Sequence, residues 1–311
     1  MTDIDLHPSR CLKRNKIMPR KTVLFSIFLV CIQLNAQIPR GTVKEGLICK
    51  SKILDQKVRY TIYLPFDYET SDRFYPVVYL LHGYTDNDMA WIQFGEAHLI
   101  ADGAIANREI APMILVTPDA GVSWYINNYN GTVRFEDFFI LEFIPFIESK
   151  YRIRTERQYR AVSGLSMGGY GSLIYAFRHP ELFSACAAFS AGIHTEDEYV
   201  QMEDKDWDKK YGPLYGPDLK GEERITTHLK MYNPIQIMQQ ADPDPIKRVR
   251  LYLDCGDDDS LSKGNSILHR VLKDLKIPHE YRVRDGGHTW EYWRSGLKDG
   301  LKFISTGFHQ P

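Results

Sequence analysis

The chain has few of the features that mark several large classes of protein. It has five cysteines in 311 residues, and no two of them have the Cys-x-x-Cys spacing of a zinc site or a redox motif. Its formal net charge is −1, with no block of basic residues in the body of the chain, so nothing indicates a nucleic-acid partner. Internal repeats and low-complexity linkers are also absent from the sequence. With 43% hydrophobic and 25% charged residues, the composition is that of an ordinary globular protein.

An apolar run near the N-terminus is too short to cross a membrane. It covers residues 22–34, follows two basic residues and ends near the small residue Ala36. About 20 apolar residues are needed to span a bilayer, whereas a basic start, a short apolar stretch and a small residue at the cleavage point are typical of a secretory signal. We therefore expect residues 1–36 to be a signal peptide that is cleaved after Ala36. Residues 1–17 would then be an extension upstream of a start at Met18.

The remaining residues, 37–311, are expected to form a single domain that is secreted or periplasmic. Residues 1–36 carry six basic and two acidic side chains, so the rest of the chain has a net charge of −5, which suits a soluble exported protein. Three cysteines remain, and because this number is odd, at least one of them must be unpaired. Cys186 lies in the apolar run FSACAAFSAG, and we expect it to be a buried, inert thiol.

Short apolar runs recur along the body of the chain and alternate with helix-like segments. Several runs are continuous, which is typical of strands buried on both faces of a parallel sheet. Strands that alternate with helices predict an α/β fold with a mostly parallel central sheet and helices on both faces. The polar segment 194–247 interrupts the alternation, and we expect it to be a partly helical insertion over the active-site end of the sheet. The predicted strands are VRYTIYLP near 58, PVVYLLHG from 76, PMILVTPDA from 112, YRAVSG near 159, FSACAAFSAG from 183, RVRLYLDCG from 248 and HEYRVRDGG from 279.

Ser166 stands between glycines at the point where a predicted strand gives way to a predicted helix. The stretch GLSMG, residues 164–168, follows the strand-like YRAV and precedes a helix-like segment that ends at Pro180. A five-residue pattern with three fixed positions is common by chance, but in this context it has a physical meaning. Glycines on both sides allow a strained turn from strand to helix that holds a nucleophilic serine at the end of the sheet. The pattern therefore predicts that Ser166 is a nucleophile.

A serine hydroxyl becomes a good nucleophile only when a base accepts its proton, and in such a fold the chain order is serine, acid, histidine. His288 lies in a Gly-Gly-His turn after the last strand-like run and is the expected base. His82, in the apolar LLHG, is expected to be structural. The acid is expected in LYLDCGDDDS, where the spacing after the strand favours Asp259, with Asp258 as the alternative. Asp254 still belongs to the strand, and its side chain is expected to point away from the site.

Acyl transfer also needs hydrogen-bond donors for the oxyanion that develops on the carbonyl oxygen. We expect the backbone N–H of Met167, directly after the nucleophile, and that of Tyr84, in the loop after an earlier strand. Trp124 and Tyr125, in DAGVSWYINNYNG, are candidates for binding an aromatic acid or a sugar face, and packing in the core is an equal alternative. Trp290 is a third candidate for binding the substrate, with packing of the histidine turn as the alternative.

The ordered motifs LLHG, GLSMGGYG, LDCGDDDS and GGHTWEYW resemble those of the putative-esterase (esterase D-like) branch of the α/β-hydrolases. This branch includes carbohydrate esterase family 1, with feruloyl and acetylxylan esterases and tributyrin esterase relatives. The resemblance covers residues 45–305 and implies a catalytic triad of Ser166, Asp259 and His288 that works without a metal or another cofactor. The loop after Gly83 departs from the commoner glycine-rich form of the family, because it continues Tyr-Thr-Asp.

The resemblance and the predicted export signal together favour one class of substrate. An exported esterase meets acylated polysaccharides and oligosaccharides, whereas the cytosolic S-formylglutathione hydrolases of the same family have no need of export. We therefore expect removal of feruloyl or acetyl groups from plant cell-wall glycans. A general short-chain carboxylesterase and an acyltransferase are the alternatives. A non-catalytic glycan-binding protein is disfavoured, because a binder has no use for a strained serine and its base.

Overall fold

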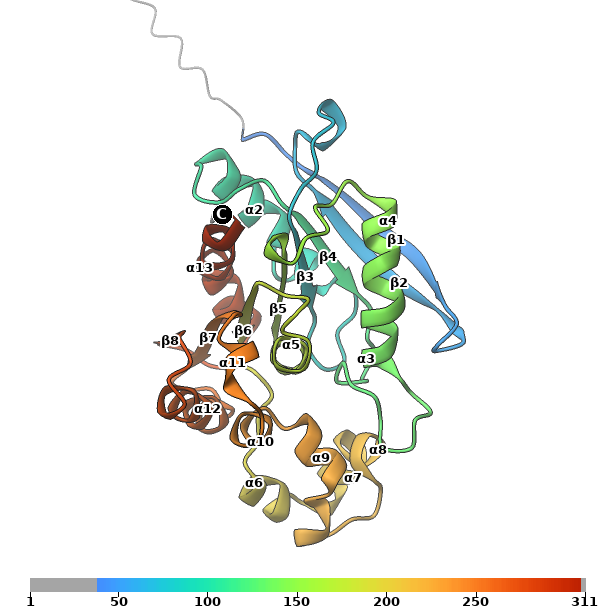
Figure 1. Cartoon of the computed structure of the whole chain (residues 1–311), viewed down its shortest axis with the longest axis vertical. Helices are drawn as coiled ribbons and strands as arrows, with labels where there is room; N and C mark the ends of the chain where they lie inside the picture. The colour runs from blue at the N-terminus through green and yellow to red at the C-terminus, as the bar shows by residue number, and fades with distance from the viewer. Residues whose placement is uncertain (1–37, 309–311) are drawn as a thin grey trace, which may run out of the picture. The chain divides into compact units, whose positions relative to one another are not determined.

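The computed structural model describes residues 38–308, and these residues form one eight-stranded sheet with helices on both faces (Figure 1). The expected signal peptide, residues 1–36, lies outside the described residues, so its prediction stays untested. The strands are β1 (Thr42–Ser51), β2 (Gln56–Leu64), β3 (Val77–Leu81), β4 (Ile114–Pro118), β5 (Arg160–Leu165), β6 (Ala185–Phe189), β7 (Arg250–Gly256) and β8 (His279–Arg284).

The sheet is mostly parallel, which confirms the predicted α/β-hydrolase type of fold. Its strand order is β1-β2-β4-β3-β5-β6-β7-β8. The first two pairings, β1 with β2 and β2 with β4, are antiparallel, and the five that follow are parallel. The seven predicted strands correspond to β2–β8. The strand β1 is not predicted from the sequence, because its residues are mostly exposed and form no apolar run.

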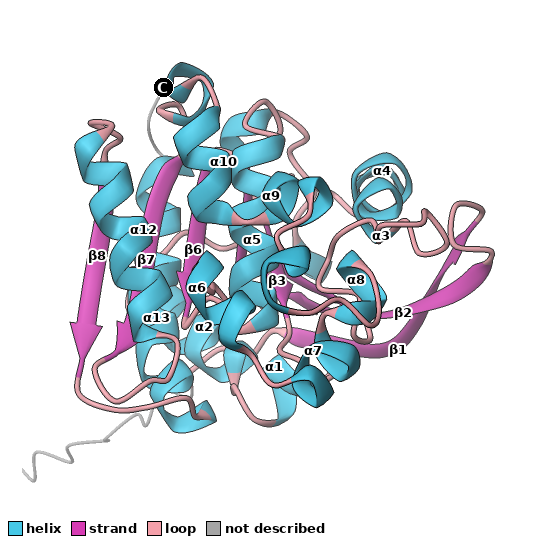
Figure 2. Cartoon of the chain, turned by 90° about the horizontal axis from the view of Figure 1, so that it is seen from below, coloured by secondary structure: helices cyan, strands magenta, loops and turns pink. Residues whose placement is uncertain are grey.

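Helices connect the strands and cover both faces of the sheet, as Figure 2 shows from below. Most are short, and the long ones follow β5, β7 and β8. The helices before β6 are η1 (Tyr68–Thr70), α1 (Ala90–Gln93), α2 (Ala97–Ala106), α3 (Phe135–Phe138), the π-helix η2 (Phe139–Phe143), α4 (Ile144–Lys150), η3 (Arg157–Tyr159) and α5 (Met167–Arg178). Those after β6 are α6 (Glu196–Gln201), α7 (Asp204–Lys210), α8 (Gly212–Tyr215), η4 (Gly221–Arg224), α9 (Thr227–Tyr232), α10 (Pro234–Gln240), α11 (Pro243–Ile246), α12 (Ser262–Asp274) and α13 (Trp290–Phe308).

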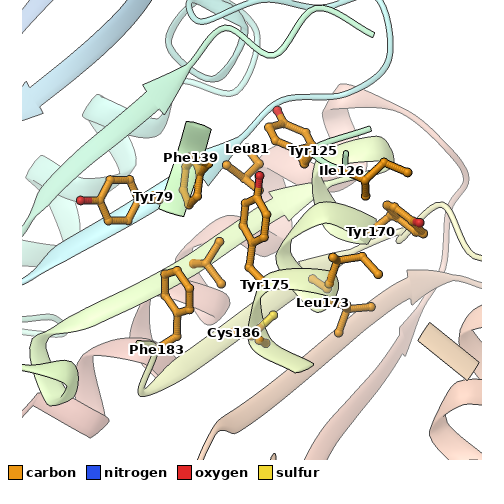
Figure 3. Close-up of a cluster of buried hydrophobic side chains, with 14 of the residues drawn as sticks. Tyr79, Leu81, Tyr125, Ile126, Phe139, Tyr170, Leu173, Tyr175, Phe183 and Cys186 are labelled. Carbon is orange, nitrogen blue, oxygen red and sulfur yellow. The ribbon is translucent and has the colours of Figure 1, made fainter. Parts of the chain in front are cut away.

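Successive residues of the central strands contribute to two separate hydrophobic layers. In β3, Tyr79 and Leu81 face the layer formed with η2, α4 and α5, whereas Val78 and Leu80 face the layer formed with α2 and α13. This alternation follows from the two-residue period of a strand. Both layers exclude water, and each buried side chain of this size stabilises the fold by roughly 1.5–3 kcal/mol. Figure 3 shows part of the first layer, where Tyr175 of α5 stacks on Phe139 with ring centroids 4.4 Å apart.

Most of the polar segment between β6 and β7 is helical, in line with the expectation of a partly helical insertion. It contains α6–α11 and η4, and several of its aromatic side chains pack against the body of the fold. Tyr211 packs on Trp124 at 5.1 Å, and the hydroxyl of Tyr215 lies 2.8 Å from that of Tyr170 in α5. The insertion therefore lies against the loop and helix that flank Ser166.

The three cysteines of the described part, Cys49, Cys186 and Cys255, are buried and carry free thiols. Burial raises the pKa of each thiol, that of Cys49 to about 11 and that of Cys255 to about 12. Such thiols stay protonated and inert, as expected for Cys186. Within residues 38–308, none of the helices is both long and apolar enough to cross a membrane.

Candidate active site

Ser166 forms the turn between β5 and α5, with φ of 53° and ψ of −117°. This positive φ is a strained conformation for any residue other than glycine. Gly164 and Gly168 make the turn possible. A Cβ at Gly164 would lie 2.5 Å from the backbone of Gly168, and a Cβ at Gly168 would lie 2.3 Å from the carbonyl oxygen of Leu81. The backbone of Ser166 is held on one side by the carbonyl oxygen of Phe189, which accepts its N–H at 2.9 Å.

Ser166, His288 and Asp259 are joined by hydrogen bonds although they are far apart in the sequence. The hydroxyl of Ser166 lies 2.9 Å from Nε2 of His288, and Nδ1 of His288 lies 2.9 and 3.1 Å from the two oxygens of Asp259. The imidazole donates through Nδ1–H to the carboxylate, so Nε2 is free to accept the serine proton. This is the geometry of a nucleophile, a base and an orienting acid.

The environment of Asp259 keeps its carboxylate charged. The residue is only 2% exposed, and burial by itself raises its pKa. The hydrogen bonds with His288 and with the N–H of Leu261, together with the nearby Ser190 hydroxyl, outweigh burial, so the net pKa is lowered. A charged carboxylate beside a histidine stabilises the imidazolium form of the ring.

The neighbouring aspartates have other partners. Asp258 is exposed, and its N–H is bonded to the carbonyl oxygen of Gly286. Asp254 is fully buried and forms an ion pair at 2.9 Å with Arg284, so its side chain points away from His288 as the sequence indicates. Of the acids considered in the sequence, Asp259 is the one that contacts His288.

The exposed carboxylates of Asp257, Asp258 and Asp285 lie within 4.8 Å of one another. Exposed acidic groups of this kind are common, and solvent screens their charges. Asp257 has a local structural role, since it accepts the N–H of Gly286 at 3.0 Å. The cluster therefore shapes the turn that carries His288, and the residues give no reason to assign a metal to it.

The two expected oxyanion donors belong to segments that adjoin the serine. Met167 is the first residue of α5, and the Tyr84 loop approaches through Gly83, where a Cβ would lie 3.8 Å from Cβ of Ser166. Within residues 38–308, neither the N–H of Met167 nor that of Tyr84 donates to a protein acceptor. Both groups are thus free to bond an anionic oxygen.

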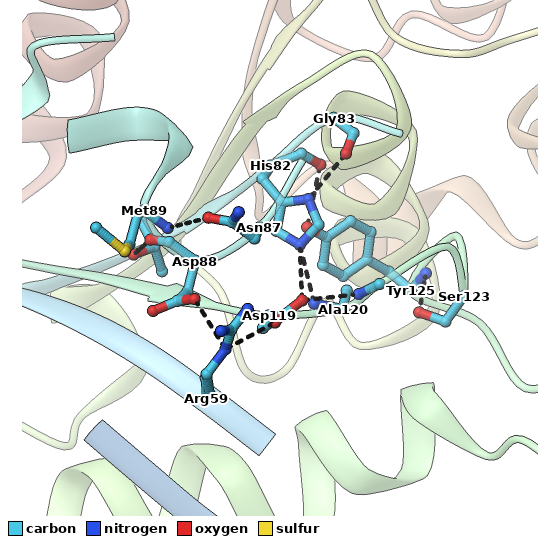
Figure 4. Close-up of polar contacts among 12 residues, drawn as sticks. Arg59, His82, Gly83, Asn87, Asp88, Met89, Asp119, Ala120, Ser123 and Tyr125 are labelled. Carbon is cyan, nitrogen blue, oxygen red and sulfur yellow. Dashed lines mark hydrogen bonds and ion pairs between the residues drawn. The ribbon is translucent and has the colours of Figure 1, made fainter. Parts of the chain in front are cut away.

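The side chain of His82 contacts the loop that carries Gly83 and Tyr84 (Figure 4). Its Nδ1–H donates to the carbonyl oxygen of Gly83 at 2.8 Å, and its Nε2 accepts the N–H of Ala120 at 2.9 Å. Burial lowers the pKa of His82, which keeps the ring neutral, as both hydrogen bonds require. His82 is therefore structural, and it fixes the loop of Gly83 and Tyr84 relative to the loop that begins after β4.

The structure corrects the suggestion that Tyr125 binds substrate. Its ring is fully buried between Phe135 and Tyr175, and its hydroxyl donates to the carbonyl oxygen of His82 at 3.1 Å. A substrate has no access to this ring, because the ring belongs to the core. Tyr125 instead supports the backbone at the end of β3.

Trp124 is close to the serine but is also largely buried, with 6% of its surface exposed. It packs against Tyr84 at 6.3 Å and Tyr170 at 5.3 Å, and its ring lies directly against Gly192. Its Nε1–H is buried and has no acceptor within residues 38–308. Trp124 therefore packs beside the loop that carries Tyr84, and its Nε1–H has no acceptor among residues 38–308.

Trp290 lies on the other side of the histidine and is half-buried. Its ring packs on Trp293 at 5.4 Å and on Phe94 at 5.7 Å, and Phe94 is 49% exposed. The side chain that packs on His288 itself is Trp293, at 4.8 Å and perpendicular. The contacts of Trp293 and Phe94 are not predicted from the sequence, and only the spacing of apolar residues in α13 could have indicated that Trp293 faces inward.

Three comparisons place the chain among known proteins. A family model described as "Putative esterase" matches residues 51–304. A solved structure described as a ferulic acid esterase is 34% identical, with a TM-score of 0.75, and the match covers 86% of this chain and 99% of that one.

Two relatives in the sequence comparison are also esterases. An esterase of Mycobacterium tuberculosis is 29% identical over 74% of this chain, and the match spans 52% of that protein, about half of its length. An acetyl esterase of Caldicellulosiruptor saccharolyticus is 27% identical over 73% of this chain and 82% of that protein. The family model covers most of the chain, and the fold and the residue geometry agree with it. The chain therefore belongs to the putative esterase family, and it has the α/β-hydrolase type of fold.

Proposed function

We propose that the protein hydrolyses esters in two steps through an acyl-enzyme on Ser166. The hydrogen-bonded chain from Ser166 through His288 to Asp259 is the observation that carries this proposal. In the first step, Nε2 of His288 accepts the serine proton while Oγ attacks the ester carbonyl carbon. Asp259 keeps the imidazole in the required tautomer and stabilises its positive charge.

The N–H groups of Met167 and Tyr84 bind the negative oxygen of the tetrahedral intermediate. His288 then gives its proton to the departing alcohol, and the acyl group stays on Ser166. In the second step, a water molecule transfers a proton to His288 and attacks the acyl carbon, which releases the carboxylic acid and restores the serine.

We propose further that the substrate is a feruloyl or acetyl ester on plant cell-wall polysaccharide or oligosaccharide. The likeness to a ferulic acid esterase and to an acetyl esterase supports this class of acyl group. Trp290 and Phe94 are partly exposed aromatic rings that connect to His288 through Trp293, and we propose that they line the path of the departing alcohol. Flat aromatic faces of this kind suit a sugar, and the unused Nε1–H of Trp124 suits a polar atom of the acyl group.

The protein is proposed to act outside the cytoplasm, as a secreted or periplasmic enzyme, after cleavage behind Ala36. The basic and apolar pattern of residues 18–36 supports export. A general short-chain carboxylesterase remains the alternative function, and an acyltransferase would need a sugar acceptor that competes with water.

A panel of acetyl, butyryl and feruloyl esters tests the proposal with the wild type and the Ser166→Ala variant. We expect hydrolysis by the wild type, faster release of ferulate or acetate from arabinoxylan oligosaccharides than of butyrate from a simple ester, and loss of all activity in the variant. A folded Ser166→Ala variant with wild-type activity would refute the mechanism. A preference for simple butyryl esters would favour the short-chain carboxylesterase, and transfer of the acyl group to added sugar would favour the acyltransferase.

A further inference from the structure

The loop after β3 makes a tight turn beside the nucleophile. Its residues 83–86 read Gly-Tyr-Thr-Asp, the stretch in which the chain departs from the commoner glycine-rich form of the family. The N–H of Asp86 donates to the carbonyl oxygen of Gly83 at 3.2 Å, and the same oxygen accepts Nδ1–H of His82 at 2.8 Å (Figure 4). The turn is therefore held by two hydrogen bonds to one oxygen, and it returns the chain toward Gly83.

The carboxylate of Asp86 lies close to Ser166. A Cβ placed on Gly83 would lie 3.1 Å from Oδ2 of Asp86 and 3.8 Å from Cβ of Ser166. The space over Gly83 thus adjoins both the carboxylate and the nucleophile. A small group bound in this space would contact both side chains.

Among residues 38–308, no side chain forms an ion pair or a hydrogen bond with the Asp86 carboxylate. The residue is half-buried, and burial raises its pKa more than nearby His82 and the backbone of Gly83 lower it. The buried carboxylate of Glu136, by contrast, is bonded by three side chains. Asp86 therefore keeps most of its acceptor capacity for another group.

A bare carboxylate at this place has a cost for ester hydrolysis. In the proposed mechanism the oxyanion develops at the N–H of Tyr84, the residue next to Gly83, and a second negative charge nearby raises the energy of that state. Water supplies donors to Asp86 in the free enzyme, and a bound substrate displaces that water. A hydroxyl of the substrate is the group that replaces the lost hydrogen bonds.

The geometry limits where this hydroxyl stands in the substrate. The ester carbon must lie against Oγ of Ser166 while the hydroxyl reaches Asp86, so the two are separated by only a few bonds. An acetyl group has no hydroxyl, and the phenolic hydroxyl of a feruloyl group is at the far end of that group. The hydroxyl therefore belongs to the alcohol, on the carbon next to the one that carries the ester.

We propose that Asp86 is a specificity-determining residue that accepts a hydrogen bond from the hydroxyl next to the ester on the alcohol part of the substrate. A carboxylate binds such a hydroxyl strongly, and the bond offsets the negative charge beside the oxyanion. Asp86 thereby favours esters of polyols, such as partly acylated sugars, over esters of plain alcohols. This inference rests on the proposed function and names the feature of the alcohol that the site recognises.

Two esters that differ only in this hydroxyl test the inference: cyclohexyl acetate and the monoacetate of trans-1,2-cyclohexanediol. We expect the wild-type kcat/KM to be about tenfold to a hundredfold higher for the hydroxy ester, the range of one hydrogen bond to a charged group. Asp86→Ala removes the acceptor and should bring the two values within about twofold of each other. Asp86→Asn keeps the shape and a neutral acceptor, and it should retain a preference of only about threefold to fivefold.

Removal of the charge has the opposite effect on the plain ester. Both Asp86 variants should hydrolyse cyclohexyl acetate about twofold to tenfold faster than the wild type, because no negative charge then lies beside the oxyanion. A side chain with a merely structural role would slow both esters alike. Opposite changes for the two esters are therefore specific to the proposed contact, and thermal melts show whether each variant is folded.

Asp72→Asn is the matched control. Asp72 is exposed and precedes β3, whereas Asp86 follows it, so the two aspartates lie at opposite ends of the same strand. This variant should have the wild-type kcat/KM for both esters.

Equal wild-type kcat/KM for the two esters, or an unchanged preference in Asp86→Ala, would overturn the inference. The Ser166→Ala variant separates this result from a failure of the proposed function. If the wild type hydrolyses both esters, Ser166→Ala hydrolyses neither and the preference survives in Asp86→Ala, ester hydrolysis at Ser166 stands and only the role of Asp86 is lost. A wild type that hydrolyses neither ester would overturn both.

Discussion

At the scale of single residues, the strained turn at Ser166 is the feature on which the proposed chemistry depends. The serine has a positive φ, and its hydroxyl meets His288 only because strand and helix approach closely on both sides of it. The glycines at 164 and 168 allow that approach. Their presence is readable from the sequence, since the need for glycine is local and appears directly as the spacing G-x-S-x-G.

A Gly168→Ala change tests this dependence. Its Cβ would lie 2.3 Å from the carbonyl oxygen of Leu81, so backbone must move, and we expect a Tm loss of several degrees together with a large fall in kcat. Gly103→Ala in α2 is the control, because a Cβ there meets nothing within 4 Å. Alanine in a helix interior is favoured over glycine by roughly 0.5–1 kcal/mol, so the control should be slightly more stable and fully active. Thermal melts and assays measure the Tm and kcat of both variants. A Gly168→Ala enzyme with wild-type Tm and kcat would contradict the account.

The choice of acid is a second test at this scale. Asp259→Asn should lower kcat by roughly 10³–10⁴-fold, because the amide no longer stabilises the imidazolium and favours the wrong tautomer. Asp258→Asn, at an exposed neighbour with no contact to His288, should keep the wild-type rate. The reverse pattern of rates would assign the acid to Asp258. The sequence alone could not settle this point, since three successive aspartates follow the strand and only the path of the turn selects one of them.

At the scale of elements, most of the strands that the sequence predicts have continuous apolar runs. These runs exist because β3–β7 are buried on both faces, and residues at such positions are mostly apolar. The strand β1 has no apolar run, because it lies at an edge and most of its side chains face solvent. Strand order is likewise not local, since it depends on pairing between segments far apart in the chain.

Glu136 links three elements and gives a pH-dependent contribution to stability. This residue of α3 is buried and bonds Arg178 and His179 at the end of α5 and the hydroxyl of Tyr232 in α9. Burial by itself raises the pKa of Glu136, but the hydrogen bonds to His179, Arg178 and Tyr232 outweigh it and lower the pKa from 4.5 to about 2. A shift of this size corresponds to about 3 kcal/mol of stability.

The sign of the pH dependence follows from this lowered pKa. The unfolded chain binds the proton first as the pH falls, so the contribution is complete above pH 4.5 and is lost between about pH 4.5 and pH 2. We expect Glu136→Gln to be less stable at neutral pH and to show a shallower decline of stability in that window. Glu45→Gln, at an exposed position of β1, should reproduce the wild-type profile. Chemical denaturation between pH 2 and pH 7 measures both, and identical slopes for Glu136→Gln and the wild type would exclude the linkage.

At the scale of the whole molecule, the fold class and the approach of Ser166, Asp259 and His288 are readable from the order of motifs along the chain. Parallel strands bring their carboxyl ends to one edge, so residues that follow different strands meet there. The side-chain environment is not readable in the same way. Tyr125 lies in the core and Trp293, not Trp290, packs on His288, because burial depends on which loops and helices close over a ring.

Export is also a property of the whole molecule. If residues 1–36 are a signal peptide, the enzyme recovered from the medium or periplasm should begin at Gln37. The intact mass of the exported protein, with N-terminal sequencing, measures this directly. Replacing the two basic residues before the apolar run with glutamate should keep the protein in the cytoplasm, whereas an enzyme found only in the cytoplasm with residues 18–36 intact would contradict export.

The central claim is that Ser166 is a nucleophile activated by His288, and covalent labelling tests it most directly. A fluorophosphonate reacts with an activated serine, so the wild type should lose activity in proportion to the attachment of one group per chain, and peptide mapping should place that group on Ser166. His288→Ala should label far more slowly, and Ser166→Ala should not label at that peptide. Full inactivation with the adduct on another residue, or rapid labelling of Ser166 in the His288→Ala variant, would contradict the account.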